Sequence, residues 1–237
     1  MLRTSLLLLL TAVLLQPADR RMSPVLVELF TSEGCSSCPP ADRLLEALDK
    51  NPDVIVLSEH VDYWNQLGWR DPYSSAAASA RQQDYAQRFR LESVYTPQMV
   101  IDGRAQEVGN DRGPIQSAIA KAGAAQKTAV EIADVSRESG KVHFRVHIPQ
   151  LMAHATVYIA LADDRARSEV ARGENRGRTL DHVAVVRKLY ALGVTDIDKA
   201  TSLPLGWEPK NGVRLIAFVQ ERGSGAILGA VRYPGLL

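Results

Sequence analysis

Hydrophobic positions follow two different periods along this chain. Residues 25–30 and 54–57 are almost continuously apolar, which is typical of strands buried on both faces of a sheet. Between them lies an apolar stripe with helical spacing, formed by Ala41, Leu44, Leu45 and Leu48. Pro39 and Pro40 favour the start of that helix, and Asn51-Pro52 its end. The pattern predicts a strand–helix–strand unit with parallel strands and a right-handed crossover.

The next segment continues the succession of strands and helices. Residues 59–75 form a long polar and aromatic loop, and Ser74 or Ser75 can cap a helix that runs to about Arg90. A strand over 98–101 then ends in the turn signal Asp102-Gly103, which predicts a hairpin to residues 106–108. A last helix opens at Gly113-Pro114. The predicted order through residue 124 is therefore β-α-β-α-β-β-α.

Beyond residue 125 the period changes from helical to strictly alternating. Apolar residues at 142, 144, 146 and 148 alternate with polar ones, and a later run over 213–219 does the same. Residues 183–189 fit either a strand or a short helix. The pattern predicts an α/β domain over 23–125 followed by an all-β, sandwich-like domain over 126–237.

The first 22 residues resemble a leader rather than part of the fold. Arg3 is followed by an apolar run over 5–15 and a polar break at 16–20, the pattern of a secretory signal peptide. The run is shorter than the roughly 20 residues that a membrane-spanning helix needs, which makes a membrane anchor the weaker alternative. We therefore expect a periplasmic or secreted protein without stable membrane insertion once the leader is removed.

Composition and charge narrow the classes of function. Hydrophobic residues make up 46% and charged residues 23% of the chain, as in ordinary globular proteins. The net charge of +1 gives no basic stripe of the kind that nucleic-acid binding requires. Nucleic-acid partners are therefore not expected.

The two cysteines of the chain stand in one motif, Cys35-Ser36-Ser37-Cys38, directly before the first predicted helix. Two residues at this spacing can form a disulfide, and the amides at a helix N-terminus stabilise a thiolate. The pattern predicts a redox-active dithiol. Two alternatives remain open: an inert bridge, and a metal site using Cys35, Cys38 and His60.

The first 124 residues resemble the thioredoxin superfamily in element order and in the position of the cysteine motif. The segment from Val27 to Asp42 is also similar to a family of exported bacterial proteins known only as domain of unknown function 1223. The phrases at residues 60–64 and 173–180 extend that similarity. The superfamily resemblance implies a cis peptide bond at Thr96-Pro97, beside the sulfurs, where both residues would contact a substrate strand.

The motif departs from thioredoxin in two places. Gly34 replaces the usual tryptophan, and Ser36-Ser37 replaces the usual Gly-Pro pair. The redox potential therefore does not transfer, and reductant, oxidant and isomerase all remain possible.

Roles follow from position. We expect Cys35, as the more exposed sulfur, to attack a target disulfide and Cys38 to resolve the mixed disulfide. Glu28 could be a buried carboxylate that moves protons for Cys38, or it could pair with an arginine. Glu33, beside the motif, could equally be solvated.

Four residues of the long loop are candidates for a substrate groove over Cys35: His60, Asp62, Trp64 and Trp69. The alternative is that they fill the seam between the two domains. A polar set at Glu174, Asn175, Arg176 and Arg178 is interpreted as a turn network within the β domain, with docking onto the redox face as the less favoured alternative.

The sequence thus predicts an exported thiol-disulfide oxidoreductase. Its partners would be protein or low-molecular-weight thiols and disulfides, and no cofactor is implied. The other two hypotheses are a binding module with a resting disulfide and a periplasmic metal carrier.

Overall fold

The computed structural model describes residues 23–237, so the predicted signal peptide lies outside the described residues. The N-terminal elements are β1 (Val25–Thr31), α1 (Pro39–Leu48), β2 (Val54–His60), η1 (Asn65–Leu67), α2 (Ala76–Phe89), β3 (Gln98–Ile101), β4 (Ala105–Val108) and α3 (Arg112–Gly123). The C-terminal elements are β5 (Glu131–Glu138), β6 (Lys141–His147), β7 (Ala155–Glu169), β8 (Thr179–Leu192), η2 (Val194–Asp196), β9 (Thr201–Pro204), β10 (Val213–Glu221) and β11 (Ile227–Arg232). The order predicted through residue 124 agrees with these elements.

One mixed sheet of eight strands forms the centre of the molecule, in the order β11-β10-β7-β8-β2-β1-β3-β4. Strands β1 and β2 are parallel, as the strand–helix–strand pattern predicted, and β3 runs antiparallel to β1. Strand β8 lies beside β2 in parallel, pairing Val185 with Ser58. The sheet therefore continues across residue 125, and strands from both parts of the chain share it.

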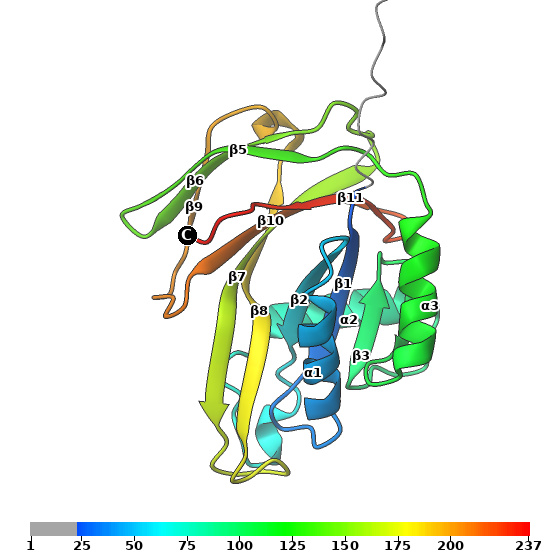
Figure 1. Ribbon diagram of the computed structural model, residues 1–237, viewed down its shortest axis with the longest axis vertical. Coiled ribbons are helices and arrows are strands. Elements are labelled where there is room, and N and C mark those ends of the chain that lie inside the picture. The colour runs from blue at the N-terminus through cyan, green and yellow to red at the C-terminus, as the bar shows by residue number, and fades with distance from the viewer. Residues whose placement is uncertain (1–22) are drawn as a thin grey trace, which may run out of the picture.

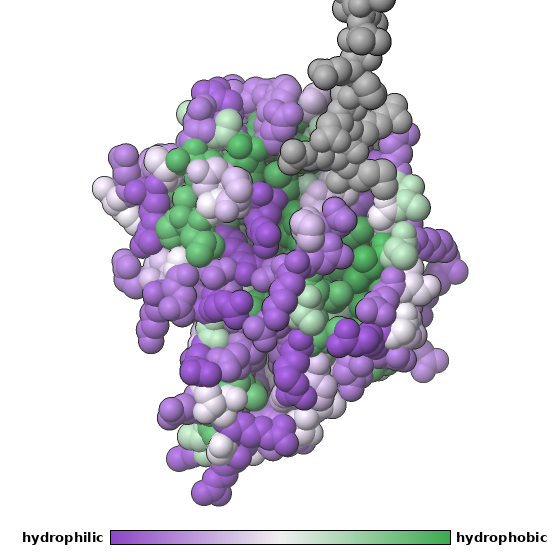
Figure 2. Space-filling model, in the orientation of Figure 1, coloured by the Kyte–Doolittle hydropathy of each residue, from purple (hydrophilic) through white to green (hydrophobic). Residues whose placement is uncertain are grey.

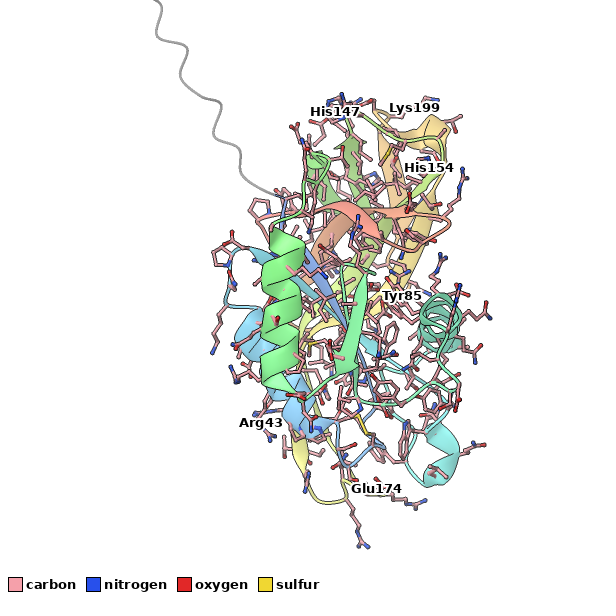
Figure 3. All side chains as sticks on the ribbon, turned by 90° about the vertical axis from the view of Figure 1, so that its right-hand side faces the viewer. Arg43, Tyr85, His147, His154, Glu174 and Lys199 are labelled. Carbon is pink, nitrogen blue, oxygen red and sulfur yellow. A yellow bond between two sulfur atoms is a disulfide. The ribbon has the colours of Figure 1, made fainter. Side chains whose placement is uncertain are left out.

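Helices cover both faces of this sheet, α1 and α3 on one face and α2 on the other (Figures 1 and 3). Because side chains alternate along a strand, β1 contributes to both layers. Val27 and Leu29 pack with Leu44 and Leu45 of α1, whereas Phe30 packs with Tyr85 of α2. This alternation decides which polar side chains of β1 and β2 can reach the cysteines.

A second antiparallel sheet, β5-β6-β9, packs over the other end of the large sheet. Val142, Phe144 and Val146 of β6 bury their side chains against Ile159 of β7 and Leu215 of β10. The predicted all-β sandwich is not confirmed, because β7, β8, β10 and β11 extend the mixed sheet. Residues 183–189, which fitted strand or helix, belong to β8.

The hairpin of β7 and β8 is long, with strands of 15 and 14 residues. One end pairs with β10, and the other runs down past α1 to the turn that precedes that helix (Figure 1). Glu174, in the hairpin loop, lies at the opposite end of the molecule from His147 and His154 (Figure 3). The hairpin thereby brings residues 170–178 to the cysteine motif.

A groove of about 630 Å³ lies between the C-terminal end of α1, the start of β1 and α3. Figure 2 shows apolar side chains gathered in this region. The groove is lined by Leu48, at the last turn of α1, whereas Cys38 caps the first turn. A helix of ten residues is about 15 Å long, so the groove is remote from the cysteines.

No helix among residues 23–237 combines the length and apolar composition that crossing a bilayer would require.

Candidate functional site

Cys35 and Cys38 form a disulfide at the start of α1, with their Cα atoms 5.4 Å apart. Cys38 is the N-cap residue, and its amide donates to the carbonyl of Cys35 at 3.2 Å. Both cysteines are fully buried, with 0% of their surface exposed. The expectation that Cys35 is the more exposed sulfur is therefore wrong for this disulfide state, because the chain folds back over the motif.

The loop between β7 and β8 provides that cover. The side-chain amide of Asn175, itself fully buried, donates to the carbonyls of Glu33 and Cys35 at 2.8 and 2.9 Å. The carboxylate of Glu174 accepts a hydrogen bond from the amide of Ser36 at 3.0 Å. The less favoured interpretation of this segment is thus the one that the contacts support: it docks onto the motif rather than forming only a turn network.

The two tryptophans of the long loop contact the two residues that precede the motif. A Cβ placed on Gly34 would lie 3.1 Å from Cβ of Trp64, and the indole of Trp64 donates to Oγ1 of Thr96 at 2.9 Å. The indole of Trp69 donates to Glu33 at 2.8 Å. Gly34 therefore permits the close approach of Trp64, in the position where a larger residue would collide.

The peptide bond between Thr96 and Pro97 is cis, as the superfamily resemblance implied. Pro97 is buried. Gly109 lies between Pro97 and the first turn of α1. A Cβ placed on Gly109 would lie 2.9 Å from Cβ of Pro97 and 3.2 Å from that of Ala41. Thr96 and Pro97 thus lie near the cysteine end of α1.

A cluster of acids and imidazoles lies buried behind the motif, and we call it the acid–imidazole cluster. Its members are Glu33, Asp42, His60, Asp71 and His182, each exposing at most 7% of its surface. His60 Nδ1 lies 2.7 Å from Asp71, whose carboxylate also accepts from the amide of Glu33. The rings of His60 and His182 meet edge to face, with centroids 4.6 Å apart. Glu33 is therefore buried and bonded, not solvated.

His182 connects two of these acids. Its Nε2 lies 3.3 Å from Glu33 and its Nδ1 lies 3.8 Å from Asp42. Burial alone would lower the pKa of His182, but the neighbouring carboxylates of Asp42 and Glu33 outweigh burial and raise that pKa to about 10. Likewise burial opposes ionisation of Asp71, yet His60 and two amide donors bring the pKa of Asp71 down to about 2. His182 and Asp71 are therefore both charged at neutral pH.

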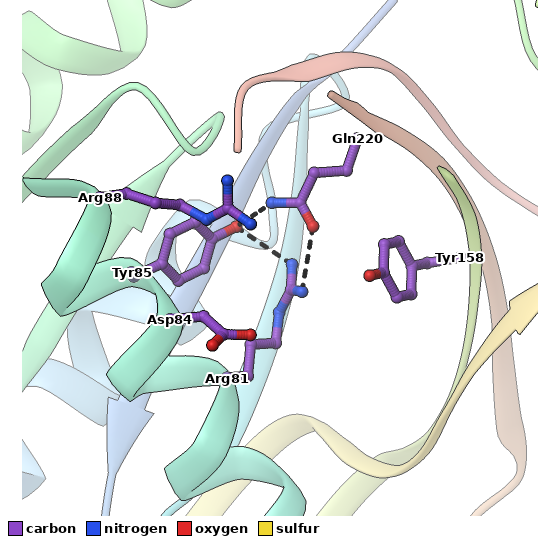
Figure 4. A pocket seen from close by; sticks show the side chains of 6 residues that line it. All are labelled: Arg81, Asp84, Tyr85, Arg88, Tyr158 and Gln220. Atoms are coloured by element: carbon purple, nitrogen blue, oxygen red, sulfur yellow. Dashed lines mark hydrogen bonds between the residues drawn. The ribbon is translucent and has the colours of Figure 1, made fainter. Parts of the chain in front are cut away.

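Glu28 lies on the other face of the sheet and does not meet the cysteines. Its carboxylate accepts from Arg81 and from the hydroxyl of Tyr85, both at 2.5 Å, among the α2 side chains. Arg81 also bonds Gln220 and Tyr85 (Figure 4). The predicted proton transfer from Cys38 to Glu28 is therefore contradicted by position, and the alternative of an arginine partner holds.

Asp62 is also engaged away from the sulfurs. Its carboxylate accepts from Ser79 at 2.5 Å, and its amide donates to the same hydroxyl, which ties the loop to the first turns of α2. Of the four predicted groove residues, Trp64 and Trp69 contact Gly34 and Glu33, the residues just before the motif. His60 lies behind it, within the acid–imidazole cluster.

Asp42 and His182 escaped the sequence analysis as members of the site, and docking of Asn175 onto the motif was only its less favoured alternative. Asp42 follows Cys38 by one helical turn, a spacing that could have indicated a shared face. Asn175 and His182 carry no comparable signal, because only the pairing of β8 with β2 brings them to the motif.

Among the described residues, no group of three or more His, Cys, Asp and Glu side chains is arranged to hold a metal ion. His60, a ligand in the metal hypothesis, has its Nδ1 bonded to Asp71.

Replacing Asn175 with alanine tests whether the β7–β8 loop shields the disulfide. The carbonyls of Glu33 and Cys35 would each lose a buried donor, so we expect the free energy of unfolding to fall by about 2–4 kcal/mol. A phosphine reductant should then reduce the disulfide faster than in the parent protein. The matched control is Glu174→Gln, an exposed change that keeps an acceptor for Ser36. Equal reduction rates in Asn175→Ala and parent would show that this loop does not shield the sulfurs.

Comparison with known proteins gives two findings. The family described as "Protein of unknown function (DUF1223)" matches residues 26–220. The crystal structure of protein AGR_C_4864 from Agrobacterium tumefaciens, a structural-genomics target, is similar with a TM-score of 0.70 and 28% sequence identity. That match covers 92% of this chain and 98% of that chain. No curated protein matches the sequence.

Proposed function

The chain belongs to the DUF1223 family of proteins of unknown function, and we propose that it is an exported thiol-disulfide oxidoreductase using Cys35 and Cys38. Its substrates would be protein or low-molecular-weight thiols and disulfides in the periplasm or outside the cell. The β-α-β-α-β-β-α order and the cysteine pair before α1 support a thioredoxin-like origin for residues 23–125. In this proposal, the strands after residue 125 serve to position the hairpin loop.

The observation that carries the proposal is the setting of the disulfide. A bridge that closes only four residues stabilises a fold by about 2 kcal/mol in the chain-entropy account, which is little for a structural role. This bridge instead lies at a helix N-terminus, where backbone amides favour a thiolate, with a charged cluster behind it. Such a setting favours reactivity over simple cross-linking.

The proposed exchange conserves atoms and electrons. In the reduced protein the Cys35 thiolate attacks a partner disulfide, forming a mixed disulfide and releasing one partner sulfur as a thiolate. The Cys38 thiol then loses its proton and attacks Cys35. The protein disulfide re-forms, and the second partner sulfur leaves as a thiolate. The partner is reduced by two electrons and the protein is oxidised by two.

Access to Cys35 requires the hairpin loop to move, because Asn175 and Glu174 bond the motif in the oxidised protein. Trp64 and Thr96 would form one wall of the opened site, and Pro97 its floor. Trp69 bonds Glu33 and packs against Gly173 of the β7–β8 hairpin loop. In this proposal Trp69 therefore governs how readily the hairpin loop opens.

Trapping with Cys38→Ser tests the function. This variant keeps the attacking sulfur but cannot resolve the adduct, so it should accumulate mixed disulfides with partners from the exported fraction. The matched control, Cys35→Ser, should accumulate few. The reverse pattern would exchange the two roles, and the absence of adducts with both variants would argue against exchange.

A binding module with a resting disulfide is the second candidate, favoured by the complete burial of both sulfurs. The reduction potential distinguishes the two. A value below about −300 mV, together with slow alkylation of the reduced thiols, would indicate a structural bridge.

A further inference from the structure

We propose that Asp42 accepts the proton of Cys38 when that thiol resolves a mixed disulfide, and that His182 is the positioning residue that holds Asp42 ready. This inference rests on the proposed thiol-disulfide exchange. It gives the C-terminal part of the chain, through His182, a positioning role in the chemistry of the N-terminal motif.

Asp42 is placed for this task by the helix itself. Residues four apart lie on the same side of a helix, and the amide of Asp42 donates to the carbonyl of Cys38 at 3.1 Å. The Asp42 carboxylate points into the protein and exposes 7% of its surface. One oxygen, Oδ1, accepts from the hydroxyl of Thr31 at 3.1 Å. A buried carboxylate thus stands one turn behind the resolving cysteine.

His182 approaches Asp42 from β8. Its Nε2 is fixed near Glu33 at 3.3 Å, and its Nδ1 faces Oδ1 of Asp42 at 3.8 Å. Within residues 23–237 this Nδ1 has no hydrogen-bond partner, although the side chain exposes only 1% of its surface. Burying a ring nitrogen without a hydrogen-bond partner costs free energy. The orientation of Nδ1 toward Asp42 therefore calls for an explanation. A proton shared with Asp42 during exchange would supply it.

Titratable side chains face His182 from each element that packs against it. Glu33 faces it from the turn before α1, Asp42 from α1, His60 from β2, and Tyr73 from the loop before α2. Two further acids lie close to His182 without bonding its ring. Asp71 pairs with His60, and the neighbouring Asp181 pairs with Arg167 at the surface.

These surroundings favour a cationic His182 at neutral pH. The Asp42 carboxylate that would take the proton lies 3.8 Å from Nδ1 of this ring. The same ring lies 3.3 Å from Glu33, two residues before Cys35.

The step is balanced. The Cys38 S–H bond breaks, its proton passes to the Asp42 carboxylate, and the sulfur electron pair forms the bond to Cys35. The bond between Cys35 and the partner sulfur breaks, and the partner leaves as a thiolate. In the opposite direction, protonated Asp42 returns the proton to the Cys38 thiolate as the protein disulfide is reduced.

A single-turnover reaction of the reduced full-length protein with dithiobis(nitrobenzoate) separates the two steps. Attack by Cys35 releases one coloured thiolate, and resolution by Cys38 releases the second. We expect Asp42→Asn to slow the second release by about 10²-fold and to change the first much less, since positioned proton acceptors contribute about 10²–10⁴-fold. His182→Gln should slow the second release less than Asp42→Asn does.

The pH profile supplies a readout that a purely structural role would not move. In the parent protein the second release should depend weakly on pH near neutrality. In Asp42→Asn it should rise with pH, because the Cys38 thiol must then ionise without a local acceptor. Asp42→Glu, which restores a carboxylate, should recover the second release in part.

Glu28→Gln is the matched control, because it removes a buried acid from the opposite face of the sheet. Near-ultraviolet circular dichroism identifies variants that fail to fold, and His182→Gln then stands in for Asp42→Asn. An unchanged second release in folded Asp42→Asn would overturn the proton-transfer role alone. A parent protein that shows no first release would overturn the exchange itself.

Discussion

Replacing Arg81 with methionine is expected to lower the free energy of unfolding by about 3–5 kcal/mol, since it leaves buried acids without their counter-ion. Arg81 Nε donates to Glu28 at 2.5 Å, and the two side chains expose 10% and 1% of their surfaces. The guanidinium also lies over the ring of Tyr85 at 5.1 Å and over that of Phe218 at 5.4 Å. Methionine keeps much of this packing and removes only the charge and its hydrogen bonds.

Urea unfolding at neutral pH measures this effect. The double variant Arg81→Met/Glu28→Gln should recover part of the lost stability, because the unpaired carboxylate is then absent. The control is Arg88→Met on the same helix, whose guanidinium donates to exposed loop carbonyls at Arg222 and Gly223. A loss no larger for Arg81→Met than for Arg88→Met would contradict the ion pair's importance.

Glu59→Gln is expected to flatten the dependence of stability on pH between about 4.5 and 8. Glu59, on β2, is buried with 3% of its surface exposed, and its Oε1 has no hydrogen-bond partner among the described residues. Burial raises its pKa from 4.5 to about 8, against the attraction of Arg81 and with the support of Glu28. The folded protein therefore holds a proton here that the unfolded chain releases above its ordinary pKa.

The sign follows from that difference. Where the folded state binds more protons, stability falls as pH rises. The contribution of Glu59 is thus fully present below about pH 4.5 and is lost by about pH 8. Each pKa unit is worth about 1.4 kcal/mol, so the loss across this window is on the order of a few kcal/mol. Glutamine at 59 should remove that slope, and stability curves at several pH values would show it.

A slope that persists in Glu59→Gln would mean that another group causes it. Asp71 provides an internal check, because its lowered pKa makes stability rise with pH rather than fall. Its contribution is present above its ordinary pKa and is lost only as pH falls toward about 2. The two acids therefore affect opposite ends of the pH range.

The two buried polar clusters lie on opposite faces of the sheet, and we expect them to have different roles. On the α2 face, Glu28, Glu59, Arg81 and Tyr85 hold β1 and β2 against α2 and β10. On the α1 face, the acid–imidazole cluster lies behind the cysteines. Stability measurements address the first cluster, and exchange kinetics address the second.

Local chemistry allowed the sequence alone to predict much of the N-terminal part. Apolar periodicity placed β1, α1 and β2, and Asp102-Gly103 placed the β3–β4 turn, because these signals depend on neighbouring residues. Ser75 caps α2 through the amide of Ala78 at 3.1 Å, as its position before the helix indicated. The cysteine pair before a helix predicted a bridge for the same local reason.

Only the tertiary structure decided what surrounds that bridge. Alternation along β1 shows that Glu28 and Leu29 face opposite ways, but it does not say which face carries α1, and Glu28 lies on the other one. The pairing of β8 with β2 is a long-range choice among several apolar strands, and no local pattern specifies it. That pairing brings His182 and Asn175 to the motif across about 140 residues. Burial of the sulfurs and the charge behind them follow from it.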